Sequence, residues 1–399
     1  MIKVYSRATD SFLETNRTIG KIESNEQGPT IIFFCGIHGN EPSGIFALNQ
    51  VFQEIKKKEI PTKGNVYAFA GNMWALKRSE RFHKKDLNRL WFGKRMKALE
   101  QDDFEPENED EKQQALIFKA FQEVLSQKKG PFYFFDLHTT SSETIPFLTV
   151  NDSLLNRKFT KQYPVPLILG IEEYLDGTLL SYINELGYVS FGFEAGSHND
   201  PKSIENHKAF AFLSMVFSGV VDKNLIDYNH YFSMLGGNKS EFYEIYHRHA
   251  VKPEDEFVMK PGFVNFQSIS KGRHLANVNG QPLYAPDHSK IFMPLYQMQG
   301  DDGFFLIRKI PAFLLSLSAF LRKLKIDRLL VGLPGVRKSA VEKDSLLVNL
   351  KTARLLAKPF LHLLGFRSKT ADKTHLIIRN REINAKTKDY KGELWYQQS

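Results

Sequence analysis

The stretch FFCGIHGNEPSG, residues 33–44, joins the end of an apolar run to an imidazole and a carboxylate three residues apart. The run TIIFFCG (30–36) is typical of a buried strand. A helix is expected from about Pro42 onward, because proline is favoured just inside a helix start. His38 and Glu41 are therefore expected in the turn between a buried strand and a helix.

Further apolar runs predict strands that alternate with helices. These strands are NVYAFAG (65–71), FYFFDLH (132–138) and YVSFGFEAG (188–196), and helices are expected over about 112–127 and 174–187. The alternation predicts an α/β fold with a mixed central sheet flanked by helices. Ligands of such sheets bind outside the carboxyl ends of the strands. His38, His138 and Glu194 each fall at or just past such an end.

The pattern changes twice along the chain and predicts three parts. Residues 1–226 form the α/β part, and 227–310 contain short apolar runs broken by Gly, Pro and NG, which are typical of a smaller β-domain. Residues 311–399 are expected to be a basic, helical C-terminal extension. Residues 301–399 hold 20 Lys/Arg and 9 Asp/Glu, a net +11, whereas residues 1–300 hold the remaining 34 and 36, a net −2.

The amphipathic helix expected at the start of this extension has three possible roles. It packs on the body, pairs with another subunit or lies on an anionic surface, and packing is favoured because regular apolar positions are usually buried. Nucleic-acid binding is not expected, since basic and aromatic residues do not interleave in a known module. A homo-oligomer stays open.

The composition indicates in which cellular compartment the protein is expected. No apolar stretch approaches the roughly 18–20 residues of a membrane span, and the start, MIKVYSRATD, is polar where a signal peptide would be apolar. Cys35 is the only cysteine, so it forms no internal disulfide. A cytoplasmic protein is therefore expected. Cys35 itself is expected to be an inert core residue.

The three strand-end residues suggest metal chemistry. A zinc ion that activates water needs three protein ligands and one open position. A His-x-x-Glu pair in one turn can supply two ligands, and DLHTT (136–140) places His138 at another strand end. Asp136 is either a hydrogen-bond acceptor for a ligand histidine or a strand-end carboxylate bonded to the backbone.

Four ordered motifs, GIHGNEPSG (36–44), RFHKKDLNR (81–89), DLHTT and FGFEAG (191–196), resemble the succinylglutamate desuccinylase/aspartoacylase family. That family belongs to the zinc-carboxypeptidase superfamily, and the resemblance covers roughly residues 27–310. It implies a mixed α/β sheet that bears one zinc per chain, with a C-terminal β-domain that narrows access to the site.

The resemblance also implies roles for individual residues. His38, Glu41 and His138 match the zinc ligands, and Glu194 matches the general acid/base. Arg81 matches the arginine that polarises the scissile carbonyl and stabilises the oxyanion, and Asn88 with Arg89 matches the pair that binds a substrate carboxylate.

The chain departs from the family pattern at two places. Aspartoacylases carry another substrate-binding arginine shortly before the catalytic glutamate, whereas SYINELGYVSFGFE (181–194) contains no basic residue. The family also places a tyrosine near the end of the β-domain, where this chain has Phe304 and Phe305. Amide hydrolysis is therefore expected to be kept, but recognition of a second acidic group is not, unless Arg273 or Arg308 substitutes.

Three functions remain open. The first is a zinc amidohydrolase acting on an N-acyl amino acid or a similar small amide. The second is a metallocarboxypeptidase-like enzyme acting on a peptide or cell-wall fragment. The third is a binding or scaffold protein with a vestigial metal site, which the intact set His38, Glu41, His138 and Glu194 disfavours.

Overall fold

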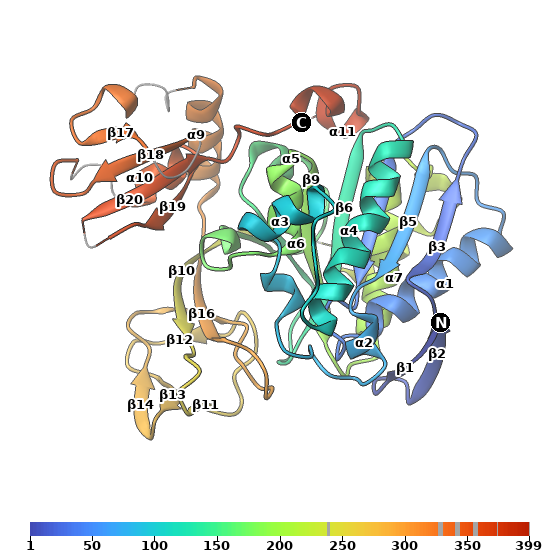
Figure 1. The fold of residues 1–399 in the computed structure, drawn as a ribbon, viewed down its shortest axis with the longest axis horizontal. Helices are drawn as coiled ribbons and strands as arrows, with labels where there is room; N and C mark the ends of the chain where they lie inside the picture. The colour runs from blue at the N-terminus through green and yellow to red at the C-terminus, as the bar shows by residue number, and fades with distance from the viewer. Residues whose placement is uncertain (238–239, 326–329, 340–343, 354–357, 373, 399) are drawn as a thin grey trace.

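The structure is a computed structural model that describes residues 1–237, 240–325, 330–339, 344–353, 358–372 and 374–398. In this part of the chain, eleven strands form a mixed sheet in the order β12-β15-β16-β10-β8-β7-β9-β6-β4-β5-β3 (Figure 1). The strands are β3 (Thr18–Glu23), β4 (Thr30–Cys35), β5 (Asn65–Ala70), β6 (Phe132–Thr140), β7 (Phe147–Val150), β8 (Leu167–Leu169), β9 (Val189–Ser197), β10 (Phe242–Ala250), β12 (Ser268–Ile269), β15 (Ser289–Phe292) and β16 (Asp302–Lys309).

The centre of the sheet is parallel and buried on both faces. Strand β4 runs parallel to β5 and β6, and β6 runs parallel to β9. Successive side chains of a strand point to opposite faces, so Ile31 and Phe33 pack in one core cluster and Ile32 and Phe34 in another. This arrangement explains why TIIFFC is apolar without interruption.

Helices cover the two faces of the sheet. Helices α1 (Ser43–Lys57) and α7 (Lys202–Phe217) contribute to the core cluster of Phe33, and α4 (Glu109–Gln127) contributes to that of Phe34. The other helices of this part are α2 (Met73–Leu76), η1 (Leu87–Arg89), α3 (Gly93–Glu100), α5 (Leu154–Thr160), η2 (Ile171–Glu173), α6 (Leu179–Glu185), η3 (Lys223–Leu225) and α8 (Tyr228–Met234).

The helix expected over 174–187 is shorter than predicted. Helix α6 begins only after Thr178, whose side chain accepts a hydrogen bond from the backbone N–H of Ser181. Gly177, with φ +71°, precedes this cap and lies in the left-handed region that interrupts a helix. The other predicted strands and helices of the first 200 residues are present.

The segment 227–310 extends the main sheet as well as forming a sheet of its own. Strands β10, β16, β15 and β12 belong to it and continue the eleven-stranded sheet. A separate antiparallel sheet consists of β11 (Phe257–Met259), β13 (His274–Val278) and β14 (Gln281–Tyr284), and the N-terminal hairpin consists of β1 (Ile2–Ser6) and β2 (Ser11–Thr15).

The prediction of a helical extension over 311–399 is wrong in part. Antiparallel strands form a sheet in the order β17-β18-β20-β19, next to two helices. These strands have only three to six residues, so the sequence did not show a strand pattern. The elements are α9 (Ala312–Lys323), β17 (Val336–Lys338), β18 (Ser345–Asn349), α10 (Lys358–Leu363), β19 (Phe366–Thr370), β20 (His375–Asn380), η5 (Thr387–Tyr390) and α11 (Leu394–Gln397).

The last residues of the chain return to the α/β part. Tyr390 and Trp395 are buried in the same core cluster as Phe33, and Trp395 Nε1 donates to the Tyr133 hydroxyl at 2.9 Å. In Figure 1, η5 and α11 follow β20 back across the top of the main sheet. The chain therefore contacts the α/β part both before the C-terminal sheet, through α9, and after it, through η5 and α11.

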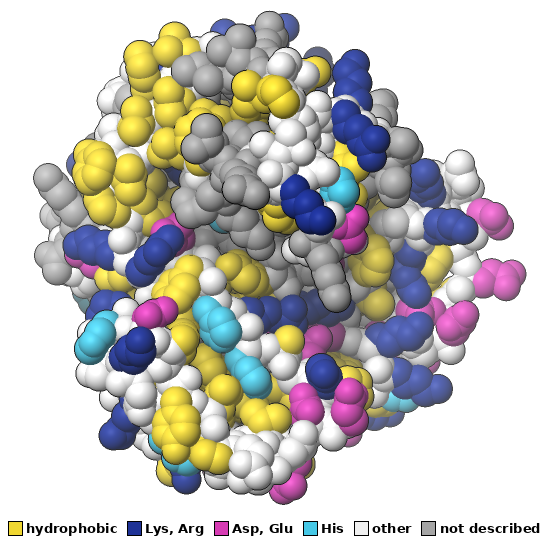
Figure 2. All heavy atoms as spheres, turned by 90° about the vertical axis from the view of Figure 1, so that its left-hand side faces the viewer, with side chains coloured by type: hydrophobic (Ala, Val, Ile, Leu, Met, Phe, Trp, Pro, Cys, Tyr) yellow, Lys and Arg dark blue, Asp and Glu magenta, His cyan; other side chains and the backbone are white. Residues whose placement is uncertain are grey.

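The C-terminal segment, residues 311–399, exposes several large hydrophobic side chains. Figure 2 shows hydrophobic side chains gathered at the upper left of this face, in the region of the C-terminal segment. The exposed large hydrophobic residues of the segment include Phe313, Leu317, Phe320, Leu324, Val331, Leu333 and Phe360. No helix of the described residues is long and apolar enough to cross a membrane.

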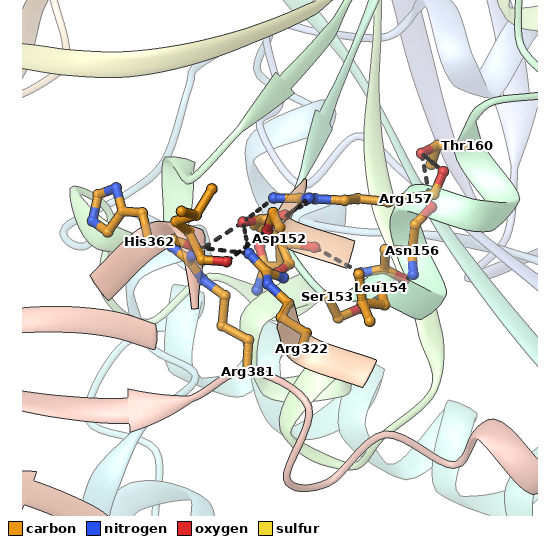
Figure 3. Close-up of polar contacts among 12 residues, drawn as sticks. Asp152, Ser153, Leu154, Asn156, Arg157, Thr160, Arg322, His362 and Arg381 are labelled. Carbon is orange, nitrogen blue, oxygen red and sulfur yellow. Dashed lines mark hydrogen bonds and ion pairs between the residues drawn. The ribbon is translucent and has the colours of Figure 1, made fainter. Parts of the chain in front are cut away.

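A buried ionic cluster joins the C-terminal segment to the body (Figure 3). The Asp152 carboxylate accepts hydrogen bonds from Arg157, from Arg322 Nη2 at 2.8 Å and from Arg381 Nη1 at 3.1 Å. Burial by itself would raise the pKa of Asp152, but the three guanidinium groups hold it well below its usual range. Glu172, Glu173 and Glu382 pair with the same arginines, so the charges of the cluster are compensated.

Candidate metal centre

The loop after β4 positions His38 and Glu41 at the carboxyl end of the strand. Gly36 has φ +64°, which turns the chain sharply away from the sheet. Gly39 passes so close to another loop that a Cβ atom would lie 2.1 Å from the carbonyl carbon of Ala75. The N–H of Glu41 donates to the carbonyl of His38 at 3.2 Å, which closes the turn before α1.

The side chains of His38, Glu41 and His138 converge in a buried cluster. One potential ligand atom from each lies within 4.8 Å of the others. The Glu41 carboxylate lies between the imidazoles, with Oε1 2.9 Å from His38 Nδ1 and Oε2 3.1 Å from His138 Nδ1. Two histidine nitrogens and one carboxylate are a donor set of catalytic zinc sites, so these residues could hold Zn²⁺.

The far nitrogen of each imidazole contacts an aspartate. His38 Nε2 lies 3.1 Å from Asp86 Oδ1, and His138 Nε2 lies 2.8 Å from Asp136 Oδ2. A carboxylate on the far nitrogen fixes the tautomer and orientation of a metal-binding histidine. Asp136 thus lies close to the His138 imidazole, although neither of its oxygens has a hydrogen bond of good geometry among the described residues. The position of Asp86 was not predicted, although this residue lies within the motif RFHKKDLNR.

The pKa values of the two glutamates of the site are shifted in opposite directions. Burial would raise the pKa of Glu41, but the His38 and His138 imidazoles hold it well below its usual range. Burial raises the pKa of Glu194 to about 8, and the Glu41 and Asp136 carboxylates add to the rise while His138 opposes it. Among the described residues, Glu194 Oε2 is buried without a hydrogen-bond partner. A glutamate with a raised pKa and an oxygen that has no hydrogen-bond partner is suited to accept and release a proton.

Strand register brings Glu194 next to the cluster. In the parallel pair β6–β9, His138 is the direct neighbour of Glu194. The structure therefore brings together residues from three strand ends, as the sequence predicted from the topology of parallel sheets.

The three remaining predicted residues lie in the same pocket. Arg81 Nη1 donates to Glu41 Oε1 at 3.2 Å, and Arg89 Nη2 donates to Asp302 Oδ2 at 2.9 Å. Asn88 Oδ1 accepts from the backbone N–H of Leu179 at 2.9 Å, which ties η1 to the start of α6. All seven predicted site residues line one pocket, together with Thr139, His198, Leu180, Phe305, Asp301 and Asp302.

Two acidic residues at the start of β16, Asp301 and Asp302, also line this pocket, although the sequence did not predict them there. Asp302 bridges two arginines, because its Oδ1 also accepts from Arg248 Nε at 2.6 Å. Asp301 lies beside it and contributes to a raised pKa of Arg89, although burial of Arg89 acts in the opposite direction. These residues are more than 200 positions from Arg89 in sequence, so no local signal linked them.

Part of the chain is similar to a known protein family. Residues 27–216 match the family model of the succinylglutamate desuccinylase/aspartoacylase catalytic domain. Just under half of the chain is therefore similar to that catalytic domain. The matched range includes all seven predicted site residues of the catalytic domain and ends before β10.

Curated relatives of the family align only locally. A succinylglutamate desuccinylase of Pseudomonas fluorescens strain SBW25 is 34% identical over 77 residues, which are 19% of this chain and 23% of the relative. A succinylglutamate desuccinylase of Yersinia enterocolitica is 30% identical over 119 residues, 28% of this chain and 32% of the relative. The chain thus matches less than a third of the length of these relatives.

Solved structures of the family share the fold. The succinylglutamate desuccinylase of Vibrio cholerae matches with a TM-score of 0.56 and 16% identity, covering 77% of this chain and 90% of that protein. A product-bound ectoine utilization protein of Ruegeria pomeroyi matches with a TM-score of 0.53 and 16% identity, covering 73% and 88%. At this identity the similarity supports the desuccinylase/aspartoacylase fold alone.

Proposed function

We propose that the protein is a zinc-dependent amidohydrolase that releases an acyl group from an N-acyl amino acid or a similar small amide with a carboxylate. The observation that carries the proposal is the buried His38–Glu41–His138 cluster beside Glu194, whose Oε2 has no hydrogen-bond partner among the described residues. The family of residues 27–216 supports the same class of reaction.

In this proposal, His38, Glu41 and His138 hold one zinc ion per chain. When bound, zinc lowers the pKa of water toward about 7 and polarises a carbonyl group. Glu194 accepts the proton of the attacking water and returns it to the leaving amine. Arg81, next to Glu41, faces the pocket and stabilises the negative charge that develops on the scissile carbonyl oxygen.

Asn88 and Arg89 are proposed to bind the carboxylate of the substrate. A guanidinium group suits this task because its N–H groups match a carboxylate in bidentate geometry. Asp302 now pairs with Arg89, and Arg248 shares the same aspartate. Arg248 would keep Asp302 compensated when Arg89 turns toward a substrate. A reducing cytoplasm as location stays a prediction, as does a homo-oligomeric state.

Removal of either histidine of the cluster is expected to abolish metal binding. The purified protein should contain about one zinc per chain, and His38→Ala or His138→Ala should lower the content to a small fraction of this. Metal analysis by mass spectrometry after gel filtration measures the effect. His230→Ala, an exposed histidine on α8, is the control and should keep its zinc. Full zinc occupancy in both cluster variants would contradict the ligand assignment.

Substrates with one carboxylate are expected to be preferred over those with two. Among the described residues, Arg81 and Arg89 are the arginines that line the pocket. Arg308 pairs with Glu244 at 2.6 Å and is largely exposed, and Arg273 stacks on Phe263. Leaving a second carboxylate unpaired in the pocket would cost on the order of several kcal/mol.

The test compares kcat/KM for N-acetylated monocarboxylic amino acids with that for N-acetylaspartate and N-succinylglutamate. The monocarboxylic substrates should be better by about tenfold or more. Asp301→Asn, which removes a negative charge from the pocket, should improve N-acetylaspartate relative to the others. A tenfold preference of the wild type for N-acetylaspartate would contradict the prediction. A dipeptide as best substrate would favour the carboxypeptidase-like alternative.

A further inference from the structure

Helix α9 packs on the body with only part of its apolar surface. Leu315 and Leu321 are partly buried against two core clusters, whereas several large apolar side chains face solvent. Its buried side chains are Ser318 and Arg322. Ser318 donates to the Leu363 carbonyl at 2.8 Å, and Arg322 donates to Asp152 at 2.8 Å. The expectation that this helix buries its regular apolar positions is therefore wrong only in part, because Leu315 and Leu321 are partly buried while other apolar positions are exposed.

The exposed side of α9 carries an apolar stripe, which consists of Phe313, Leu317, Phe320 and Leu324. Their exposed fractions are 68%, 40%, 58% and 57%. The spacing of four, three and four residues places them within about 60° of one another around a helix with 3.6 residues per turn. Surface helices normally show the reverse pattern, with the apolar stripe inside. A contiguous exposed stripe marks a surface that another body covers.

The charge of the residues around the stripe indicates which kind of partner covers it. Lys323 and Lys325 are exposed at the C-terminal end of the stripe, and residues 303–326 contain no Asp or Glu. Residues 301–399 carry a net +11, so two copies that met along this helix would bring like charges together. A partner that is apolar inside and negative at its surface would match both the apolar stripe and the positive charge beside it.

We propose that α9 is an interfacial helix that binds the surface of an anionic lipid bilayer. Phe and Leu on one face with Lys at its edge are the composition of helices that lie in the plane of a membrane. Twelve residues extend only about 18 Å, which is too short for a roughly 30 Å hydrocarbon core. The apolar stripe enters the headgroup boundary, and Lys323 and Lys325 contact the negative headgroups.

The surface is separate from the catalytic pocket. No residue of α9 lines the pocket of His38 and Glu194 among the lining residues of the described chain. The proposal therefore holds or fails independently of the proposed hydrolase activity. It places the enzyme body beside the bilayer through the C-terminal segment.

The test is flotation of the full chain with lipid vesicles. We expect binding to phosphatidylcholine vesicles that contain about one third phosphatidylglycerol, at least about tenfold weaker binding to pure phosphatidylcholine, and weakening by salt. Phe313→Ser with Phe320→Ser should reduce binding to the anionic vesicles about tenfold or more. Lys323→Glu with Lys325→Glu should also reduce it. Both pairs are exposed, so circular dichroism and thermal unfolding should match the wild type.

Val258→Ser is the matched control, because Val258 is 54% exposed on β11 and lies outside α9. It should float with anionic vesicles like the wild type. Failure of the wild type to bind the anionic vesicles overturns the proposal, as does binding that the serine pair leaves unchanged. Equal binding to neutral vesicles also overturns it. A dimer in sedimentation equilibrium that the serine pair dissociates, without vesicle binding, assigns the stripe to a second copy instead.

Discussion

Glu194→Gln is expected to lower hydrolysis by about 10²–10⁴-fold while zinc content stays at the wild-type level. Glutamine keeps the size of the side chain and its hydrogen-bonding capacity, but it does not accept the proton of the attacking water. Glu194 is buried beside His138, and its Oε2 has no hydrogen-bond partner among the described residues. The measurement pairs kcat for the best N-acyl amino acid with metal analysis of the same preparation.

Glu143→Gln is the control for this variant. Glu143 is an exposed glutamate on the loop after β6, and its replacement should leave both kcat and zinc content unchanged. Full activity of Glu194→Gln would show that another group is the base. Loss of zinc from Glu194→Gln would instead indicate that Glu194 helps to hold the metal.

The centre of the fold was predictable because its signals are local. The apolar runs that lead to Cys35 and His138 belong to strands buried on both faces, and such strands are rich in apolar residues. Parallel neighbours end at the same edge of a sheet, so the side chains of His38, His138 and Glu194 had to meet there. The motif residues Arg81, Asn88 and Arg89 line the same pocket.

The parts that were missed depend on contacts distant in sequence. Asp86 is close to its motif, but only the folded loop places its carboxylate on His38 Nε2. Asp302 reaches Arg89 because β16 joins the main sheet through β10, a topology that no spacing in the sequence reveals. The C-terminal sheet was missed for another reason. Its strands have three to six residues, so the alternation of apolar and polar residues is too short to detect.

In helix α9 the predicted periodicity is present, but only part of the apolar positions are buried: Leu315 and Leu321 pack on core clusters. The apolar positions 313, 317, 320 and 324 do form one face of a helix, as the sequence predicted. The buried face is nevertheless the one with Arg322, since its guanidinium reaches the Asp152 carboxylate of the body.

The same cluster predicts the largest effect on stability. Asp152→Asn is expected to destabilise the protein by about 3–5 kcal/mol, because three buried guanidinium groups lose their shared carboxylate. Urea unfolding followed by circular dichroism should show a lower midpoint. Hydrogen exchange should rise first in α9 and β20, the elements adjoining Arg322 and Arg381. Asp176→Asn is the control, since Asp176 pairs with Arg367 and Lys369 but is largely exposed, and it should cost at most about 1 kcal/mol.

The pH dependence of this difference tests whether charge is its cause. The pKa of Asp152 is lower in the folded protein than in the unfolded chain, where it is about 4. Its contribution is therefore complete at neutral pH and is lost as the pH falls below about 4. The gap in unfolding free energy between wild type and Asp152→Asn should narrow over that range. A difference in unfolding free energy that stays constant down to acidic pH would instead point to packing. An effect of the Asp152 charge must decrease as the carboxylate is protonated, whereas an effect of packing does not depend on pH.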